Sequence, residues 1–208
     1  MALAWRCPFP GDATGYIEDG PKLGMIREDI ETMRLHLVSP SQAHEAAFMA
    51  MIEEFIGAGE REYVYEQPLF EWGFPAYLDW LIRGEQGELD GLVPWSAFWA
   101  LDASSGALVG MSSLRHRLSP WMAQFGGHIG YRIRPTLRRR GLGAELLRLT
   151  LARAGARGIA NALVVCTPDN LGSQGVLRRN GAQFDGEVST QGHSLNRYWV
   201  STIAGEGN

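Results

Sequence analysis

The sequence predicts an α/β fold in which helices flank a mixed, mostly antiparallel central sheet. Two observations support this: 208 residues suit a single domain, and the hydrophobic spacing switches between the helical period and the period of two typical of strands. The expected order of elements is βααβββαβαββ. We expect the domain at residues 33–202, an N-terminal extension or cap at 1–32 and a tail at 203–208.

The first half of the domain is expected to hold one strand and two helices. In "MRLHLV", two leucines alternate with polar residues, as in a half-buried strand. The following "SPSQ" predicts a helix N-terminus with Ser39 as the N-cap. This helix would end at Gly57 and bury an apolar face made of Phe48, Met51, Ile52 and Phe55. A second helix is expected near Pro75–Arg83.

The second half begins with a two-residue period. "WSAFWALD" and "ALVGMSSLRHRL" around the turn "ASSG" predict a β-hairpin, and "GGHIGYRI" predicts the next strand. "GLGAELLRLTLARAG" is a helix and "NALVVCT" a buried strand. "DNLGSQGVLRRNGA" predicts a helix that Asp169 or Asn170 caps and Gly181 ends. "QFDGEVS" and "LNRYWVST" form a final strand pair.

The net charge of −4 conceals an uneven distribution. Residues 16–90 hold 16 acidic side chains against five basic ones, whereas residues 132–157 hold eight arginines against one acidic residue. A broadly basic surface would indicate nucleic acid, so this pattern argues against that partner. It favours an anionic ligand in one place and a cationic one in another, although a solvated acidic surface would give the same counts.

The composition also bears on compartment and cofactors. No run reaches the ~18 to 20 apolar residues of a membrane helix, and the N-terminus lacks the apolar core of a secretory signal. Cys7 and Cys166 are far apart and form neither a disulfide framework nor a metal-ligand pattern. Cys166 is expected to be a buried structural thiol. We therefore expect a cytoplasmic protein with no metal and no membrane partner.

The segment "RRRGLGAELLRL" places three arginines and two glycines where a helix begins. The first amides of a helix have no intrahelical acceptor, and the dipole makes this end positive. Glycines let an anion approach the backbone, and the arginines add full charges. The turn therefore predicts a polyphosphate site. A P-loop would need Gly-Lys-Ser/Thr, and a dinucleotide fingerprint a third glycine at Leu146, so neither class fits.

The turn Arg138-x-x-Gly141-x-Gly143 matches the Arg/Gln-x-x-Gly-x-Gly/Ala signature of the GNAT superfamily of N-acetyltransferases. "GYRIRP" is similar to the fourth strand of that family, and Asn170 and Ser173 resemble its Asn-x-x-Ser helix. Over residues 33–202 the chain resembles an uncharacterised bacterial branch of predicted acetyltransferases. The resemblance implies the GNAT fold, with a splay between the fourth and fifth strands, and acetyl-CoA as cosubstrate.

The resemblance also implies which residues hold acetyl-CoA. Backbone groups of Tyr131 and Ile133 would meet the pantetheine arm and the thioester. Asn170 would face the arm, and Ser173 would lie near the cofactor sulfur. The pyrophosphate would bind at the turn made of Arg138, Arg139, Arg140, Gly141, Leu142, Gly143 and Ala144.

The reaction that the resemblance implies is acetyl transfer to an amine, which loses a proton while the departing thiolate gains one. Many family members carry a tyrosine as general acid where this chain has Leu177, which leaves Ser173 or water for that role. His128 stands where many members have a glutamate near the thioester. It would act as a general base or as a structural histidine that holds the turn at 126–127. His116 is the second candidate base, with a surface role as its alternative.

In the family, the first two helices roof the acceptor site. In this chain that region is rich in carboxylates and aromatic rings, which would attract an ammonium group. The expected acceptor-binding residues are Glu53, Glu54, Tyr63 and Trp72.

The leading hypothesis is an acetyl-CoA-dependent N-acetyltransferase that acts on a primary amine of a small molecule or a protein. An acyltransferase that uses another acyl-CoA and a non-catalytic acetyl-CoA-binding module stay open as alternatives. Exposed edge strands would allow a homodimer.

Overall fold

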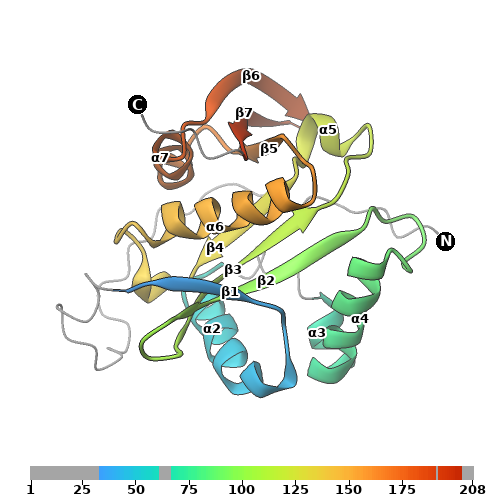
Figure 1. The fold of residues 1–208 in the computed structure, drawn as a ribbon, viewed down its shortest axis with the longest axis vertical. Helices are drawn as coiled ribbons and strands as arrows, with labels where there is room; N and C mark the ends of the chain where they lie inside the picture. Colours follow the sequence, from blue (N-terminus) through green and yellow to red (C-terminus); the bar gives the residue numbers. More distant parts are fainter. Residues whose placement is uncertain (1–32, 61–66, 191, 203–208) are drawn as a thin grey trace.

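The computed structural model describes residues 33–60, 67–190 and 192–202. The expected extension at 1–32, the tail at 203–208 and Tyr63 lie outside the described residues. Figure 1 shows a larger sheet with helices on both faces and a smaller sheet beside it. The strand order is β1-β2-β3-β4 in the larger sheet and β5-β7-β6 in the smaller one.

The larger sheet is antiparallel throughout, with strands β1 (Leu35–Val38), β2 (Trp95–Asp102), β3 (Leu108–Arg115) and β4 (Ile129–Ile133). The structure confirms the predicted hairpin between β2 and β3. In its turn, Oδ2 of Asp102 accepts hydrogen bonds of 2.6 Å from the hydroxyls of Ser104 and Ser105. Burial by itself would raise the pKa of Asp102. The hydrogen bonds from Ser104 and Ser105 outweigh this effect and lower the pKa to about 2.

Helices cover both faces of the larger sheet (Figure 1). One face carries the 3₁₀ helix η1 (Gln42–His44), α2 (Glu45–Gly57), α3 (Gln67–Trp72) and α4 (Phe74–Gln86), and the other carries α6 (Leu142–Ala156). The four side chains predicted to be buried in α2 are all 0% exposed. The predicted N-cap at Ser39 is wrong. The helical segment begins after Ser41, whose hydroxyl lies 2.9 Å from Nδ1 of His44.

The smaller sheet holds β5 (Asn161–Cys166), β6 (Gln183–Thr190) and β7 (His193–Ser201), and α7 (Leu171–Arg179) packs against α6. Asn170 rather than Asp169 caps α7, because its Oδ1 accepts a 2.9 Å hydrogen bond from the amide of Ser173. The sequence did not predict the short segments α3, α5 (Met122–Phe125) and η3 (Pro135–Leu137), since none is long enough to show a hydrophobic period.

The two sheets approach each other where β4 and β5 begin to diverge. The amide of His128 donates to the carbonyl of Leu163 at 2.6 Å, and the amide of Leu163 donates back to Nδ1 of His128 at 2.9 Å. Gly127 has a φ of 66°, and a Cβ there would stand 2.6 Å from the same carbonyl, so the close approach requires glycine. Beyond this apex the two strands belong to separate sheets, as the family resemblance implied for the fourth and fifth strands.

Candidate active site

The free edge of β4 forms one wall of the splay. The amide of Arg115 donates to the carbonyl of His128, and the amide of Arg134 donates to that of Val109, which fixes the alternation of the β3–β4 ladder. The even-numbered residues of β4 therefore bond to β3, and the backbone groups of Ile129, Tyr131 and Ile133 face the gap. The expected contact of Tyr131 and Ile133 with the pantetheine arm and the thioester stays a prediction.

The N-terminus of α6 supplies a group of amides beside this edge. Gly141 precedes the helix with a φ of 80°, and no side chain caps it. Within the described part of the chain, no backbone acceptor pairs with the amides of residues 139–143. Together with the helix dipole, these amides form the kind of site that binds a phosphate.

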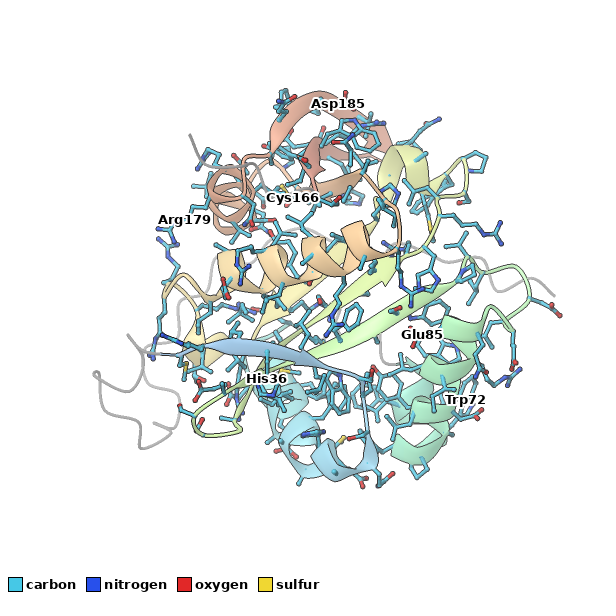
Figure 2. All side chains as sticks on the ribbon, viewed as in Figure 1. His36, Trp72, Glu85, Cys166, Arg179 and Asp185 are labelled. Atoms are coloured by element: carbon cyan, nitrogen blue, oxygen red, sulfur yellow. The ribbon has the colours of Figure 1, made fainter. Side chains whose placement is uncertain are left out.

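The three arginines of the turn differ in their surroundings. Arg138 is paired within the protein: its Nη2 donates to Glu60 at 2.8 Å and its Nε to the carbonyl of Ile133 at 3.0 Å. Its expected contact with the phosphates stays a prediction. Arg139 and Arg140 are exposed. A further arginine that the sequence did not indicate, Arg179, reaches this turn from the end of α7 (Figure 2). Its Nη1 lies 3.6 Å from the position that a Cβ on Gly141 would take.

Gly143, which is expected to belong to the pyrophosphate-binding turn, also has a role in helix packing. A Cβ at this position would lie 3.0 Å from Cγ2 of Val176, so the glycine lets α7 pack closely against the start of α6. Asn180 joins the same two helices, because its Nδ2 donates to the carbonyl of Ala144 at 3.1 Å. The relative position of α6 and α7 therefore depends on small side chains at this contact.

A cavity of about 300 Å³ connects the splay with the helical face of the larger sheet. At the splay it is lined by Tyr131, Cys166, Asn170 and Ser173, as the resemblance implied for the last two. On the far side its walls are aromatic, from α4, β2 and α5. A cavity of this size accommodates a small ligand group.

Three polar side chains meet at the splay end of the cavity. The hydroxyl of Tyr131 lies 2.8 Å from Oγ of Ser173. Burial raises the pKa of Tyr131 well above its ordinary value, against the opposing effect of this hydrogen bond, so the phenol stays protonated. Burial also raises the pKa of the Cys166 thiol, which is 7% exposed. Leu177, at the position where the family often has a tyrosine, is fully buried.

The two histidines considered as bases do not line the cavity. Nδ1 of His128 accepts the Leu163 amide, which leaves the proton of the neutral ring on Nε2. Nε2 of His116 lies 2.9 Å from the hydroxyl oxygen of Ser96. The Ser96 hydroxyl donates to the carboxylate of Glu85. Burial is the main cause that lowers the pKa of both histidines. The charge of a nearby arginine lowers it further, Arg157 for His116 and Arg115 for His128.

Glu53, Glu54 and Trp72, which were expected to bind the acceptor, do not line the cavity. Glu54 accepts hydrogen bonds from Arg134 and Thr136, Glu53 is exposed, and Trp72 is 56% exposed on α3. Figure 2 shows Trp72 on the outer side of the helical layer. From the same aromatic part of the sequence, Tyr77 and Trp80 of α4 line the cavity. Acceptor binding by the expected residues stays a prediction.

The sequence matches the family model of the acetyltransferase (GNAT) domain over residues 18–183. Together with the splay and the phosphate-type turn, this match defines the class as an acetyl-CoA-dependent N-acetyltransferase. The chain belongs to the GNAT family, and acetyl-CoA is its cosubstrate.

Solved structures of the same fold include three at low sequence identity. RimL, a ribosomal L7/L12 alpha-N-protein acetyltransferase in complex with coenzyme A, has a TM-score of 0.59 at 17% identity, covering 82% of this chain and 94% of RimL. A GNAT-family acetyltransferase from Bordetella pertussis has a TM-score of 0.57 at 22% sequence identity. The match covers 81% of this chain and 96% of that protein. MccE, a microcin C7 self-immunity acetyltransferase in complex with acetyl-CoA and AMP, has a TM-score of 0.60 at 13% sequence identity. The match covers 83% of this chain and 94% of MccE.

No curated protein matches the chain. Across the described residues, none of the helices has both the length and the apolar character needed to span a membrane.

Proposed function

We propose that the protein transfers the acetyl group of acetyl-CoA directly to a primary amine in a ternary complex. The observation that carries this proposal is the cavity of about 300 Å³, which extends from the splay to the aromatic walls on the other side of β4. A thioester held at the edge of β4 and an amine entering from the aromatic side would meet without diffusion through solvent, which accounts for much of the rate of such reactions.

In the proposed step, the nitrogen lone pair attacks the thioester carbonyl carbon, the carbon–sulfur bond breaks, and the sulfur leaves as a thiolate. The amide of Tyr131 faces the gap and can donate to the carbonyl oxygen as negative charge develops there. The hydroxyl of Ser173, supported by that of Tyr131 at 2.8 Å, passes a proton to the thiolate and regains one from the solvent that takes up the proton of the amine. The phenol at this site therefore comes from Tyr131 of β4. Leu177 of α7, at the position where many family members carry a tyrosine, has no hydroxyl.

The proton of the amine leaves through water in this proposal. Among the described residues that line the cavity there is no Asp, Glu or His. We assign His128 to holding the apex of the splay, because its Nδ1 is occupied by the Leu163 amide. The rate should therefore increase with pH according to the pKa of the acceptor's own ammonium group, with no additional histidine-like limb.

A covalent acetyl-enzyme route would need a thiolate in the cavity. Cys166 is the described cysteine there, and its burial raises the pKa of the thiol, which disfavours the nucleophilic form. Direct transfer avoids this requirement.

The test follows thiol release from acetyl-CoA with a panel of primary amines, for the wild type and Cys166→Ala. Intersecting initial-rate patterns and an active Cys166→Ala variant are expected. Parallel patterns, with loss of activity in Cys166→Ala, would establish an acetyl-enzyme instead. Tight acetyl-CoA binding in calorimetry without thiol release from any amine would favour a binding module, and faster release from a longer acyl-CoA would favour another acyltransferase.

A further inference from the structure

Arg138, the first arginine of the turn before α6, lies on the wall of the splay. Its Nε donates to the carbonyl of Ile133 at 3.0 Å, and this carbonyl belongs to the free edge of β4. A Cβ on Gly143 would stand 3.8 Å from Cγ1 of Ile133, so the same edge contacts the first turn of α6. The guanidinium therefore lies between the edge expected to hold the pantetheine arm and the amides expected to hold the diphosphate.

The rest of this guanidinium is bound from the side of α2. Glu60, just after the end of α2, accepts from it through both carboxylate oxygens: Oε1 from Nη1, and Oε2 from Nη2 at 2.8 Å. Cζ of Arg138 lies 5.6 Å from the centroid of the Phe55 ring. Carboxylates and phosphates both present two oxygens to the fork of a guanidinium. The donors that hold Glu60 can therefore hold a phosphate instead.

A neighbouring ion pair joins the same two parts of the chain more firmly. Nε of Arg134 donates to Oε1 of Glu54 at 2.5 Å, and the hydroxyl of Thr136 donates to Oε2 at 2.9 Å. The side chains of Arg134 and Glu54 are 9% and 16% exposed. Those of Arg138 and Glu60 are 39% and 24% exposed, so water competes for this second pair and less free energy is needed to open it. The Arg134 pair would keep α2 attached to the turn while Arg138 changes its partner.

We propose that Glu60 competes with the diphosphate of coenzyme A for Arg138 and thereby sets the affinity of the enzyme for its cosubstrate. When the diphosphate binds at the start of α6, the guanidinium exchanges the single charge of the carboxylate for the larger charge of the diphosphate. Opening the ion pair uses part of the binding free energy, so the apparent affinity is lower than the contacts alone would give. Coenzyme A carries the same diphosphate and leaves more readily for the same reason, which matters where product release limits turnover.

The alternative is that Arg139, Arg140 and Arg179 supply the positive charge while Arg138 stays with Glu60. The position of Arg138 against the edge of β4 favours the exchange, because in coenzyme A the diphosphate is joined directly to the pantetheine arm that this edge is expected to hold. The inference concerns only the binding of the cosubstrate. It goes beyond the proposed function and depends neither on the acceptor amine nor on the transfer step.

The test is a double-mutant cycle on the Kd for coenzyme A, measured by calorimetry with the wild type, Glu60→Gln, Arg138→Gln and the double variant. Glu60→Gln should lower the Kd about fivefold, the effect expected when a partly exposed ion pair no longer competes, and Arg138→Gln should abolish this gain. Loss of a negative charge near the phosphates would also tighten binding by general electrostatics, but that gain would not depend on Arg138. An unchanged or higher Kd in Glu60→Gln, or an equal gain in both backgrounds, would overturn the proposal.

Glu145→Gln is the matched control. Glu145 stands in the first turn of α6 and, like Glu60, pairs with an arginine, but its partner is Arg148, further along the same helix. The substitution removes the same charge from the same region. Its effect on the Kd should be equal in the wild-type and Arg138→Gln backgrounds. An effect that disappeared with Arg138→Gln would show that the coupling is not particular to Glu60, and would contradict the inference.

A crystal structure of the wild type with coenzyme A gives a second readout. The guanidinium of Arg138 should contact a phosphate oxygen and no longer Glu60, while the pair between Arg134 and Glu54 remains. A complex that keeps the bidentate pair between Arg138 and Glu60 would overturn the exchange.

Dephospho-coenzyme A identifies the group that competes, since it lacks the 3′-phosphate and keeps the diphosphate. The gain from Glu60→Gln should persist with this ligand, and its loss would assign the competition to the 3′-phosphate instead. These measurements need no turnover. Failure of every amine to release thiol would contradict the proposed function and leave this inference standing, whereas additive affinities in an active enzyme would do the reverse.

Discussion

The two ends of the cavity differ in the groups that line them. At the splay, backbone groups predominate: the edge of β4 and the amides at the start of α6. At the other end, on the face of the larger sheet that α4 covers, side chains predominate: indole rings, two guanidinium groups and a row of small residues. A backbone site depends on turn geometry, which a short motif specifies, whereas a side-chain site depends on which faces of distant strands coincide. The first kind can be shared across a family while the second varies.

Gly141→Val should show the largest effect on the backbone site. A branched side chain at a φ of 80° is strained and would stand where the phosphates approach, so the Kd for coenzyme A in calorimetry should rise at least about tenfold. Gly158→Val is the matched control, because Gly158 has the same φ at the other end of α6 and no neighbour within 4 Å. Both should lose about 1–2 kcal/mol of stability, yet the control should keep its affinity. Equal affinity loss in both would remove the turn from the site.

Ser173→Ala tests the chemistry between the two ends. Loss of the proton donor should lower kcat about 100-fold. The Kd for coenzyme A should hardly change, because Ser173 contributes no charge. Tyr131→Phe should produce a smaller decrease, since it removes the supporting hydroxyl and leaves that of Ser173. An unchanged kcat in both variants would exclude this hydroxyl pair as the proton source.

His128 distinguishes a structural role from a catalytic one. His128→Ala leaves the buried Leu163 amide without its acceptor and should cost about 1–3 kcal/mol in urea unfolding. His128→Asn presents an oxygen near the place of Nδ1 and should restore most of the stability and activity. Asparagine cannot act as a base near neutrality, so an inactive but fully stable His128→Asn would identify His128 as the base.

His128 should also make the folding stability depend on pH. Burial, then Arg115, lowers the pKa of His128 in the folded protein below its ordinary value of 6.5. The unfolded chain therefore binds more protons as the pH falls through this range. The stability contribution of the neutral ring is present above about pH 6.5 and is lost as the pH falls through the folded pKa. His128→Asn should flatten this part of the stability curve, and an unchanged curve would contradict the assignment.

His116→Gln should have the smallest effect. His116 contacts Ser96 in a group with Glu85 and Arg157, which joins α4, β2 and the end of α6 away from the cavity. We expect a small decrease in Tm and a kcat within about twofold of the wild type, because substitutions of this kind rarely exceed 1 kcal/mol. A large loss of kcat with an unchanged Tm would bring His116 back as a base.

The sequence predicted the elements whose signals are local. The period of α2 gave its buried face, the "ASSG" turn gave the hairpin, and the glycine pattern at 141 and 143 gave the α6 turn. It failed where partners come from elsewhere in the chain. Arg138 is neutralised by Glu60, 78 positions earlier in the sequence, and Arg179 reaches the turn from another helix. Neither contact has a local signature.

By itself, the sequence determined that this chain makes an α/β fold with a phosphate-type turn, because backbone conformation follows from nearby residues: glycine at positive φ, unpaired amides at a helix start and alternation along a strand. The splay came from the family resemblance. Only the tertiary structure decided which side chains surround the reacting groups. It placed the phenol of Tyr131 beside Ser173 and made Nδ1 of His128 the acceptor for the amide of Leu163. It also aligned Ala97, Ser113 and Gly130 across three strands. These outcomes depend on register and packing between segments far apart in the chain, and no single segment encodes them.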